Sequence, residues 1–137
     1  MFNSVLVQYP GTSYPQKSEI TSEPSPRMVL LSSCQISGVN TKEFKQALLK
    51  LNPDIILVGS WGEKISKEIY DFPKIAAINA HPSLLPKYRG PNPYFWTIRN
   101  QEQISGVTFH LIDKGLDTGA ILAQEEIKIY PSDTGKS

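Results

Sequence analysis

Two short apolar runs, each followed at once by small or polar residues, constrain the fold of this chain most. The first covers residues 54–58 (DIILV) and leads into Gly-Ser-Trp-Gly at 59–62. The second covers residues 75–78 (IAAI) and leads into Asn-Ala-His-Pro at 79–82. Continuous apolar runs of this length are typical of strands that are buried on both faces of a parallel sheet.

The rest of the pattern alternates helices with strands. Thr41 is a suitable N-cap for a helix in which Phe44, Leu48 and Leu51 recur at helical spacing. The pattern also predicts strands over 28–31, 107–112 and 121–129, one or two helical turns over 66–70 and a helix over 94–101. This alternation predicts an α/β fold with an open, mostly parallel central sheet of Rossmann-like type.

Length and composition set limits on organisation and partners. The chain has 137 residues, which predicts one domain. Residues 1–27 contain three prolines between 15 and 26, so we expect an irregular or linker-like segment there and a core over 28–137. The net charge of +1 does not indicate a broadly basic nucleic-acid binder.

Targeting and metal signals are weak. No apolar run approaches the roughly 20 residues of a membrane helix, and the N-terminus does not resemble a signal peptide. The single cysteine, Cys34, excludes an internal disulfide, and the two histidines lack the neighbours of a zinc site. We therefore expect a cytoplasmic protein with neither a metal nor a membrane partner.

Asn79 and His81 follow a buried strand, where open α/β sheets place their active sites. They are two residues apart, so in extended backbone their side chains point to the same side, and Pro82 then fixes the chain. An amide beside an imidazole can hold negative charge that develops on a carbonyl oxygen. The alternative interpretation is that Asn79 caps a loop while His81 packs beside Tyr88.

Asp117 is the candidate carboxylate. Gly115 and Gly119 flank it, and glycines let a backbone approach a ligand closely. The same residues also fit an ordinary turn or the cap of the next element. Asp113 competes with it but is interpreted as a strand-end residue, and His110 is interpreted as a packed or rim residue within its strand.

Lys87, Tyr88 and Arg89 form a small basic loop with an aromatic residue. Such a loop suits a phosphate or carboxylate on a substrate, although a solvated loop fits equally well. The chain contains neither a Walker-type loop nor a GxGxxG motif, which disfavours nucleotide hydrolysis and dinucleotide redox chemistry.

Together, the runs 78–90 (INAHPSLLPKYRG), 106–108 (GVT) and 115–119 (GLDTG), with Gln124, closely resemble the formyltransferase family. The resemblance covers roughly residues 52–135, with order and spacing intact. This family uses 10-formyltetrahydrofolate and includes methionyl-tRNA, glycinamide ribonucleotide and sugar-nucleotide formyltransferases. The resemblance implies a folate donor, an amine-bearing acceptor, and nucleic acid only if that acceptor is a tRNA.

The resemblance also assigns roles to individual residues. The family's catalytic asparagine, histidine and aspartate correspond to Asn79, His81 and Asp117. Asn79 and a protonated His81 would stabilise the formyl oxygen, while Asp117 favours that protonation and takes a proton from the amine. The implied cofactor-binding residues are Trp61, Gly62, Lys64, Ile65, Leu85, Asp113, Gly115 and Leu116, and the expected substrate-binding residues are Ser83, Lys87, Tyr88 and Arg89.

The match is incomplete at both ends, so we expect a formyltransferase fold that is truncated there. Residues 5–12 only faintly resemble the family's first strand and its glycine loop, and the chain stops after 131–135, where relatives continue into a helix. Two alternatives to an amine formyltransferase therefore stay open. One is a hydrolase that passes the formyl group to water, and the other is a non-catalytic remnant that binds folate or a partner.

Overall fold

The computed structural model describes residues 26–32 and 38–134. The predicted N-terminal segment 1–27, apart from its last two residues, and Cys34 lie outside this range. The elements follow one another as β1 (Met28–Ser32), α1 (Lys42–Leu51), β2 (Ile55–Gly59), α2 (Lys67–Tyr70), β3 (Ala76–His81), α3 (Pro93–Arg99), β4 (Ile104–Leu111) and β5 (Ile121–Lys128).

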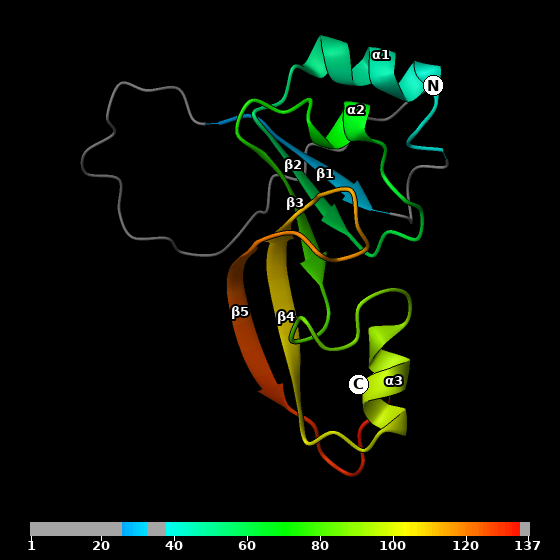
Figure 1. Ribbon diagram of the computed structural model, residues 1–137, viewed down its shortest axis with the longest axis vertical. Coiled ribbons are helices and arrows are strands. Elements are labelled where there is room, and N and C mark those ends of the chain that lie inside the picture. The colour runs from blue at the N-terminus through cyan, green and yellow to red at the C-terminus, as the bar shows by residue number, and fades with distance from the viewer. Residues whose placement is uncertain (1–25, 33–37, 135–137) are drawn as a thin grey trace, which may run out of the picture.

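The five strands form one sheet in which spatial order follows chain order. β1, β2 and β3 pair in parallel, whereas β4 pairs antiparallel to β3, and β5 antiparallel to β4. Four strands therefore run in one direction and β4 runs in the other, so the expected α/β sheet is confirmed but is mixed. Figure 1 shows α1 and α2 near the parallel strands and α3 beside the far end of β4.

Helix α1 begins and ends where its sequence predicts. The Thr41 hydroxyl accepts the N–H of Phe44 at 3.2 Å, as an N-cap should. Asn52 ends the helix in the left-handed region, with φ of 45°, and its N–H bonds to the Leu48 carbonyl. None of the helices in the described residues is long and apolar enough to cross a membrane.

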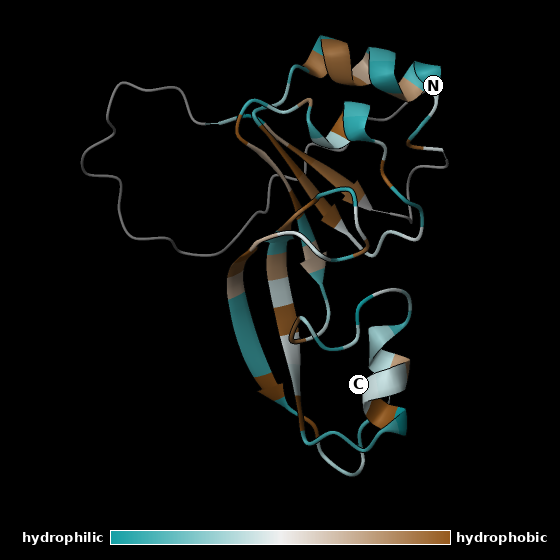
Figure 2. Ribbon diagram, viewed as in Figure 1, coloured by the Kyte–Doolittle hydropathy of each residue, from teal (hydrophilic) through white to brown (hydrophobic). Residues whose placement is uncertain are grey.

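The apolar core lies between the parallel strands and helices α1 and α2. Its least exposed side chains are Leu31 on β1, Val39 before α1, Ile56 and Val58 on β2, Leu48 on α1 and Ile69 on α2. Figure 2 shows this contrast: β1 and β2 are hydrophobic along their length, whereas β5 is largely hydrophilic. All eight residues of β5 are exposed, and the strand forms the antiparallel edge of the sheet beside β4.

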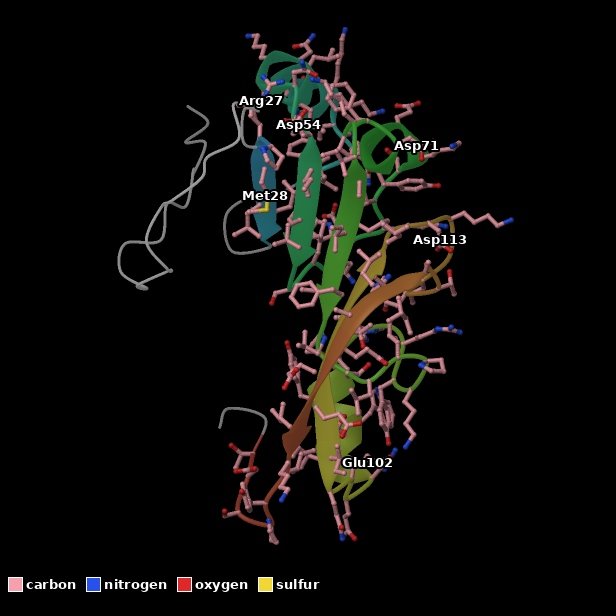
Figure 3. All side chains as sticks on the ribbon, turned by 90° about the vertical axis from the view of Figure 1, so that its left-hand side faces the viewer. Arg27, Met28, Asp54, Asp71, Glu102 and Asp113 are labelled. Carbon is pink, nitrogen blue, oxygen red and sulfur yellow. The ribbon has the colours of Figure 1, made fainter. Side chains whose placement is uncertain are left out.

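Asp54 closes the amino ends of the parallel strands. Its carboxylate accepts the Arg27 N–H at 2.7 Å and lies 3.3 Å from the Lys74 Nζ, so it joins the segments that lead into β1 and β3. The Arg27 N–H is the main cause that lowers the pKa of Asp54. Figure 3 shows Arg27 and Asp54 side by side, with Asp113 and Glu102 near opposite ends of β4.

The structure extends two predicted strands. β3 continues through His81 instead of ending at residue 78, and β4 begins at Ile104 instead of Val107. The reason is the antiparallel pairing of the two strands, in which Asn79 lies opposite His110 and His81 opposite Thr108. Strand β3 is therefore hydrogen-bonded on both sides where the candidate residues begin.

Neighbouring leucines on α1 test the position of the core. Leu48 is 2% exposed and Leu49 is 63% exposed. We predict that Leu48→Ala lowers the free energy of unfolding by about 2–5 kcal/mol, because it removes buried methyl groups and leaves a cavity. Leu49→Ala, the matched control, should change it by less than about 0.5 kcal/mol in urea denaturation followed by circular dichroism. Equal effects would contradict this packing.

Candidate active site

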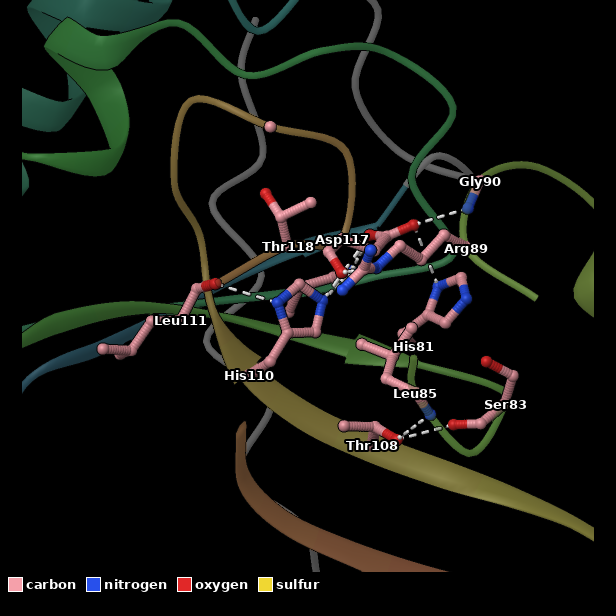
Figure 4. Close-up of polar contacts among 12 residues, drawn as sticks. His81, Ser83, Leu85, Arg89, Gly90, Thr108, His110, Leu111, Asp117 and Thr118 are labelled. Atoms are coloured by element: carbon pink, nitrogen blue, oxygen red, sulfur yellow. Dashed lines mark hydrogen bonds and ion pairs between the residues drawn. The ribbon is translucent and has the colours of Figure 1, made fainter. Parts of the chain in front are cut away.

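One carboxylate gathers the candidate residues, as Figure 4 shows for most of them. Oδ1 of Asp117 lies 3.2 Å from the amide nitrogen of Asn79 and 3.5 Å from Nε2 of His110. Its Oδ2 accepts the N–H of Gly90 at 2.8 Å and lies 3.5 Å from Nδ1 of His81. The three residues that the sequence singled out for catalysis, from β3 and a distant loop, therefore meet.

The backbone at Asp117 has an uncommon conformation. Its φ is 51°, a left-handed value that aspartate tolerates better than most residues, and its carbonyl accepts the Arg89 Nε–H at 3.0 Å. A Cβ at Gly119 would lie 1.7 Å from the Leu111 carbonyl oxygen, so only glycine fits. The glycine thus allows a close approach to β4, not to a ligand as the sequence suggested.

The charges in the site stabilise one another. Burial raises the pKa of Asp117, but the hydrogen bond with His110, the Gly90 N–H and the charges of both imidazoles outweigh it, so the pKa is lowered. Burial lowers the pKa of His110, but the hydrogen bonds to Asp117 and to the Leu111 carbonyl and the nearby carboxylate charges raise it overall. The site therefore favours an ionised carboxylate beside a protonated imidazole.

His81 lies beside both Tyr88 and Asp117. Its Nε2 lies 2.8 Å from the carbonyl oxygen of Tyr88, which can only accept, so Nε2 carries a hydrogen. Its Nδ1 faces Oδ2 of Asp117 at 3.5 Å. The imidazole thus lies between the Tyr88 carbonyl and the Asp117 carboxylate.

His110 is a residue of the site that its local sequence does not reveal. The strand pattern indicates a packed or rim residue, and His110 is indeed buried, but it lies within the site, 3.1 Å from the Asn79 amide nitrogen. Its position follows from the pairing of β4 with β3, which places His110 directly opposite Asn79. A strand's side-chain alternation can suggest the face, but no local pattern reveals its partner strand.

A cleft of about 550 Å³ opens beside these residues, between the loops that follow β2 and β4. Seven of the eight expected cofactor residues line it: Trp61, Gly62, Lys64, Ile65, Asp113, Gly115 and Leu116. The indole N–H of Trp61 is buried and has no partner among the described residues, so it is available to a bound acceptor atom. Asp113 is fixed by hydrogen bonds from the Thr118 hydroxyl and the Gly115 N–H.

Leu85, the eighth expected cofactor residue, does not line this cleft. Its side chain is buried and contributes to a different hollow, which also includes Glu102 and Gln103. Its backbone explains the placement: the Leu85 N–H bonds to the Thr108 hydroxyl, and the Gln124 amide donates to the Leu85 carbonyl. Leu85 therefore holds the loop after β3 against β4 and β5.

Of the four expected substrate-binding residues, one is exposed beside Asp117. Ser83 is 0% exposed, and its hydroxyl donates to the Lys87 carbonyl, so its side chain faces the protein interior. Tyr88 donates its hydroxyl to Glu102 at 2.7 Å, and Lys87 pairs with the same carboxylate at 3.7 Å. Only Arg89 is exposed next to Asp117.

In the part of the chain that the structure describes, no group of three histidine, cysteine, aspartate or glutamate side chains is arranged to hold a metal ion. The site therefore offers an amide, two imidazoles and a carboxylate, which are groups for proton transfer and for stabilising an oxyanion.

The pKa shifts predict a pH window for stability, which Asp117→Asn tests. Asparagine tolerates the same left-handed backbone, so the change removes charge without strain. Because the pKa of Asp117 is lowered in the folded chain, its carboxylate stabilises the fold above about pH 4, and this stabilisation is lost as the pH falls. Because the pKa of His110 is raised in the folded chain, its imidazolium stabilises the fold below about pH 6.5, and this stabilisation is lost as the pH rises.

The free energy of unfolding of the wild-type chain should therefore exceed that of Asp117→Asn most between about pH 4 and 6.5. Urea denaturation at a series of pH values measures this difference. A difference that is constant from about pH 3 to pH 9 would show that the carboxylate is not coupled to the imidazole.

Comparison with known proteins gives a consistent result. A sequence model described as formyl transferase matches residues 3–137. The chain is 46% identical over 99 residues to methionyl-tRNA formyltransferase of Syntrophus aciditrophicus, which covers 72% of this chain and 32% of that protein. It is 50% identical over 93 residues to the same enzyme of Clostridium tetani, covering 68% and 30%. The chain thus spans about a third of the length of these curated relatives.

Solved structures share the fold. Phosphoribosylglycinamide formyltransferase from Bacillus halodurans is 33% identical with a TM-score of 0.61, over 67% of this chain and 47% of that one. HypX from Aquifex aeolicus, solved in complex with tetrahydrofolic acid, is 28% identical with a TM-score of 0.58, over 63% and 15%. The family match, the relatives and the fold agree that this chain belongs to the formyl transferase family.

Proposed function

We propose that this chain carries the catalytic site of a formyltransferase that moves a formyl group from 10-formyltetrahydrofolate to a primary amine. The observation that supports this most is the convergence of Asn79, His81 and Asp117 at one end of a cleft. Distances of 3.2 Å and 3.5 Å join the carboxylate to the amide and to the imidazole. The names of the relatives support the same reaction.

The cleft wall is a suitable place for the folate donor. Trp61 offers a buried N–H without a partner, and the loop around Asp113 and Gly115 offers backbone groups. The structural neighbour that was solved with tetrahydrofolic acid supports a folate at this fold. When bound, this co-substrate supplies the formyl group on N10.

The catalytic residues act on the attacking amine and on the formyl oxygen. As the amine nitrogen bonds to the formyl carbon, negative charge builds on the oxygen, and an N–H of Asn79 and the imidazole of His81 stabilise it. Asp117 accepts the amine's proton, directly or through a water. The bond from the formyl carbon to N10 then breaks, and N10 gains a proton, so that overall one proton is lost by the amine and one is gained by the donor.

Arg89 is the residue best placed to recognise the acceptor. Its Nε–H bonds to the Asp117 carbonyl, and no described residue is hydrogen-bonded to its two Nη groups. The relatives act on methionyl-tRNA and on phosphoribosylglycinamide, both of which carry phosphate. A guanidinium with free N–H groups beside the reacting amine suits a phosphate or carboxylate of such an acceptor.

The direct test supplies 10-formyltetrahydrofolate and a panel of amine acceptors and detects one added formyl group by mass. Asn79→Ala and His81→Ala should each fold normally and lower turnover by about 10²–10³, because each removes a donor to the oxyanion. Lys87→Gln is the control, since its ammonium pairs with Glu102 away from the site. Formate release without any acceptor would instead indicate a hydrolase, and wild-type turnover in either alanine variant would overturn the assignment.

The role of Arg89 makes a separate prediction. Arg89→Gln should raise the KM for the acceptor by about 10- to 100-fold, because it removes a charge-assisted hydrogen bond of about 1.5–3 kcal/mol. The KM for the folate donor should not change, and Lys87→Gln should leave both values unchanged. Steady-state kinetics with each substrate varied in turn measures this, and an equal rise in both KM values would contradict a specific role at the acceptor.

A further inference from the structure

The amide nitrogen of Asn79 faces two partners inside the site. One N–H points to Oδ1 of Asp117 at 3.2 Å, and the nitrogen also lies 3.1 Å from Nε2 of His110. The amide nitrogen, and not its oxygen, must face this carboxylate, because two acceptor oxygens would repel each other. If Nε2 of His110 accepts the second N–H, both amide hydrogens are used inside the site, and stabilising a formyl oxygen requires that one of them be released.

The orientation of His110 determines what its Nε2 can do. Nδ1 of this ring lies 2.8 Å from the Leu111 carbonyl oxygen, so Nδ1 carries a hydrogen in every charge state (Figure 4). When the ring is neutral, its Nε2 has a lone pair and accepts an N–H of Asn79. When the ring is protonated, Nε2 carries a hydrogen and faces Oδ1 of Asp117 at 3.5 Å.

We propose that His110 is a positioning residue whose protonation state decides whether Asn79 can offer a free N–H to the formyl oxygen. The neutral imidazole occupies that N–H, and the imidazolium releases it by donating to Asp117 instead. This inference rests on the proposed formyl transfer for its consequence in catalysis. The exchange of hydrogen bonds itself does not depend on that function.

The charges around His110 favour the protonated ring, which releases the N–H of Asn79. Asp117 and Asp113 face it from the loop between β4 and β5, and His81 faces it from β3 with ring centroids 6.4 Å apart. Strand β2 carries no titratable residue, and on β5 the pairing partner is Ile121. Two carboxylates against one imidazole stabilise a positive charge on His110, so the imidazolium persists above the ordinary range of histidine.

Nuclear magnetic resonance of the ¹⁵N-labelled chain tests the exchange without any substrate. The chain contains only two histidines, so His110→Gln assigns both rings. The neutral form of His110 should carry its hydrogen on Nδ1, and the amide protons of Asn79 should shift with the titration of His110 and not with that of His81. A neutral ring protonated on Nε2, or Asn79 protons that ignore His110, would overturn the proposal even if formyl transfer is confirmed.

The catalytic consequence is tested by pH profiles. Turnover of the wild-type chain should fall as the pH rises through the pKa of His110, because the neutral ring then occupies Asn79. His110→Gln should lose the limb whose midpoint matches the resonance titration of His110, since its amide donates to Asp117 at every pH and does not titrate. Phe109→Leu, an exposed neighbour on the opposite face of β4, should keep that limb. A limb with the same midpoint in His110→Gln would refute the switch.

Discussion

The site depends on one carboxylate, that of Asp117, which is almost completely removed from water. Its side chain is 11% exposed, and a carboxylate that far from water is stable only if hydrogen bonds and opposite charges replace its hydration. Here the Gly90 N–H, the Asn79 amide and two imidazoles do so. Because these donors come from β3, from β4 and from the loop after β3, satisfying one charge is also what brings the candidate groups together.

The parallel and antiparallel halves of the sheet are stabilised by different interactions. The parallel strands carry the apolar core, where Ile56 and Val58 pack against α1 and α2. In the antiparallel half, a buried hydrogen-bond network around Thr108 takes the place of apolar packing: its hydroxyl donates to the Ser83 carbonyl at 2.6 Å and accepts from Gln124 at 2.8 Å. This network fixes the loop after β3, which presents the Tyr88 carbonyl and the Gly90 N–H to the site.

Local sequence patterns predicted the features that local physics controls. The cap at Thr41, the apolar strand β2 and the shared face of Asn79 and His81 each depend on residues a few positions apart, and each was found. The inclusion of His110 depends on which strands pair, and the buried position of Ser83 depends on a loop folding onto β4. Such long-range contacts leave no periodic signal, and the resemblance to the family supplied the convergence of Asp117 with β3 that spacing alone did not.

The most direct measurement follows an isotopic label through the reaction. The wild-type chain would be given 10-formyltetrahydrofolate with ¹³C in the formyl group and an amine acceptor, in parallel with Asp117→Asn. The account predicts that the wild-type chain transfers the labelled formyl group to the acceptor nitrogen. The labelled product should form about 10²–10⁴ times more slowly with the variant, which lacks the base. Label transfer at the same rate in both proteins would contradict the central role of this carboxylate.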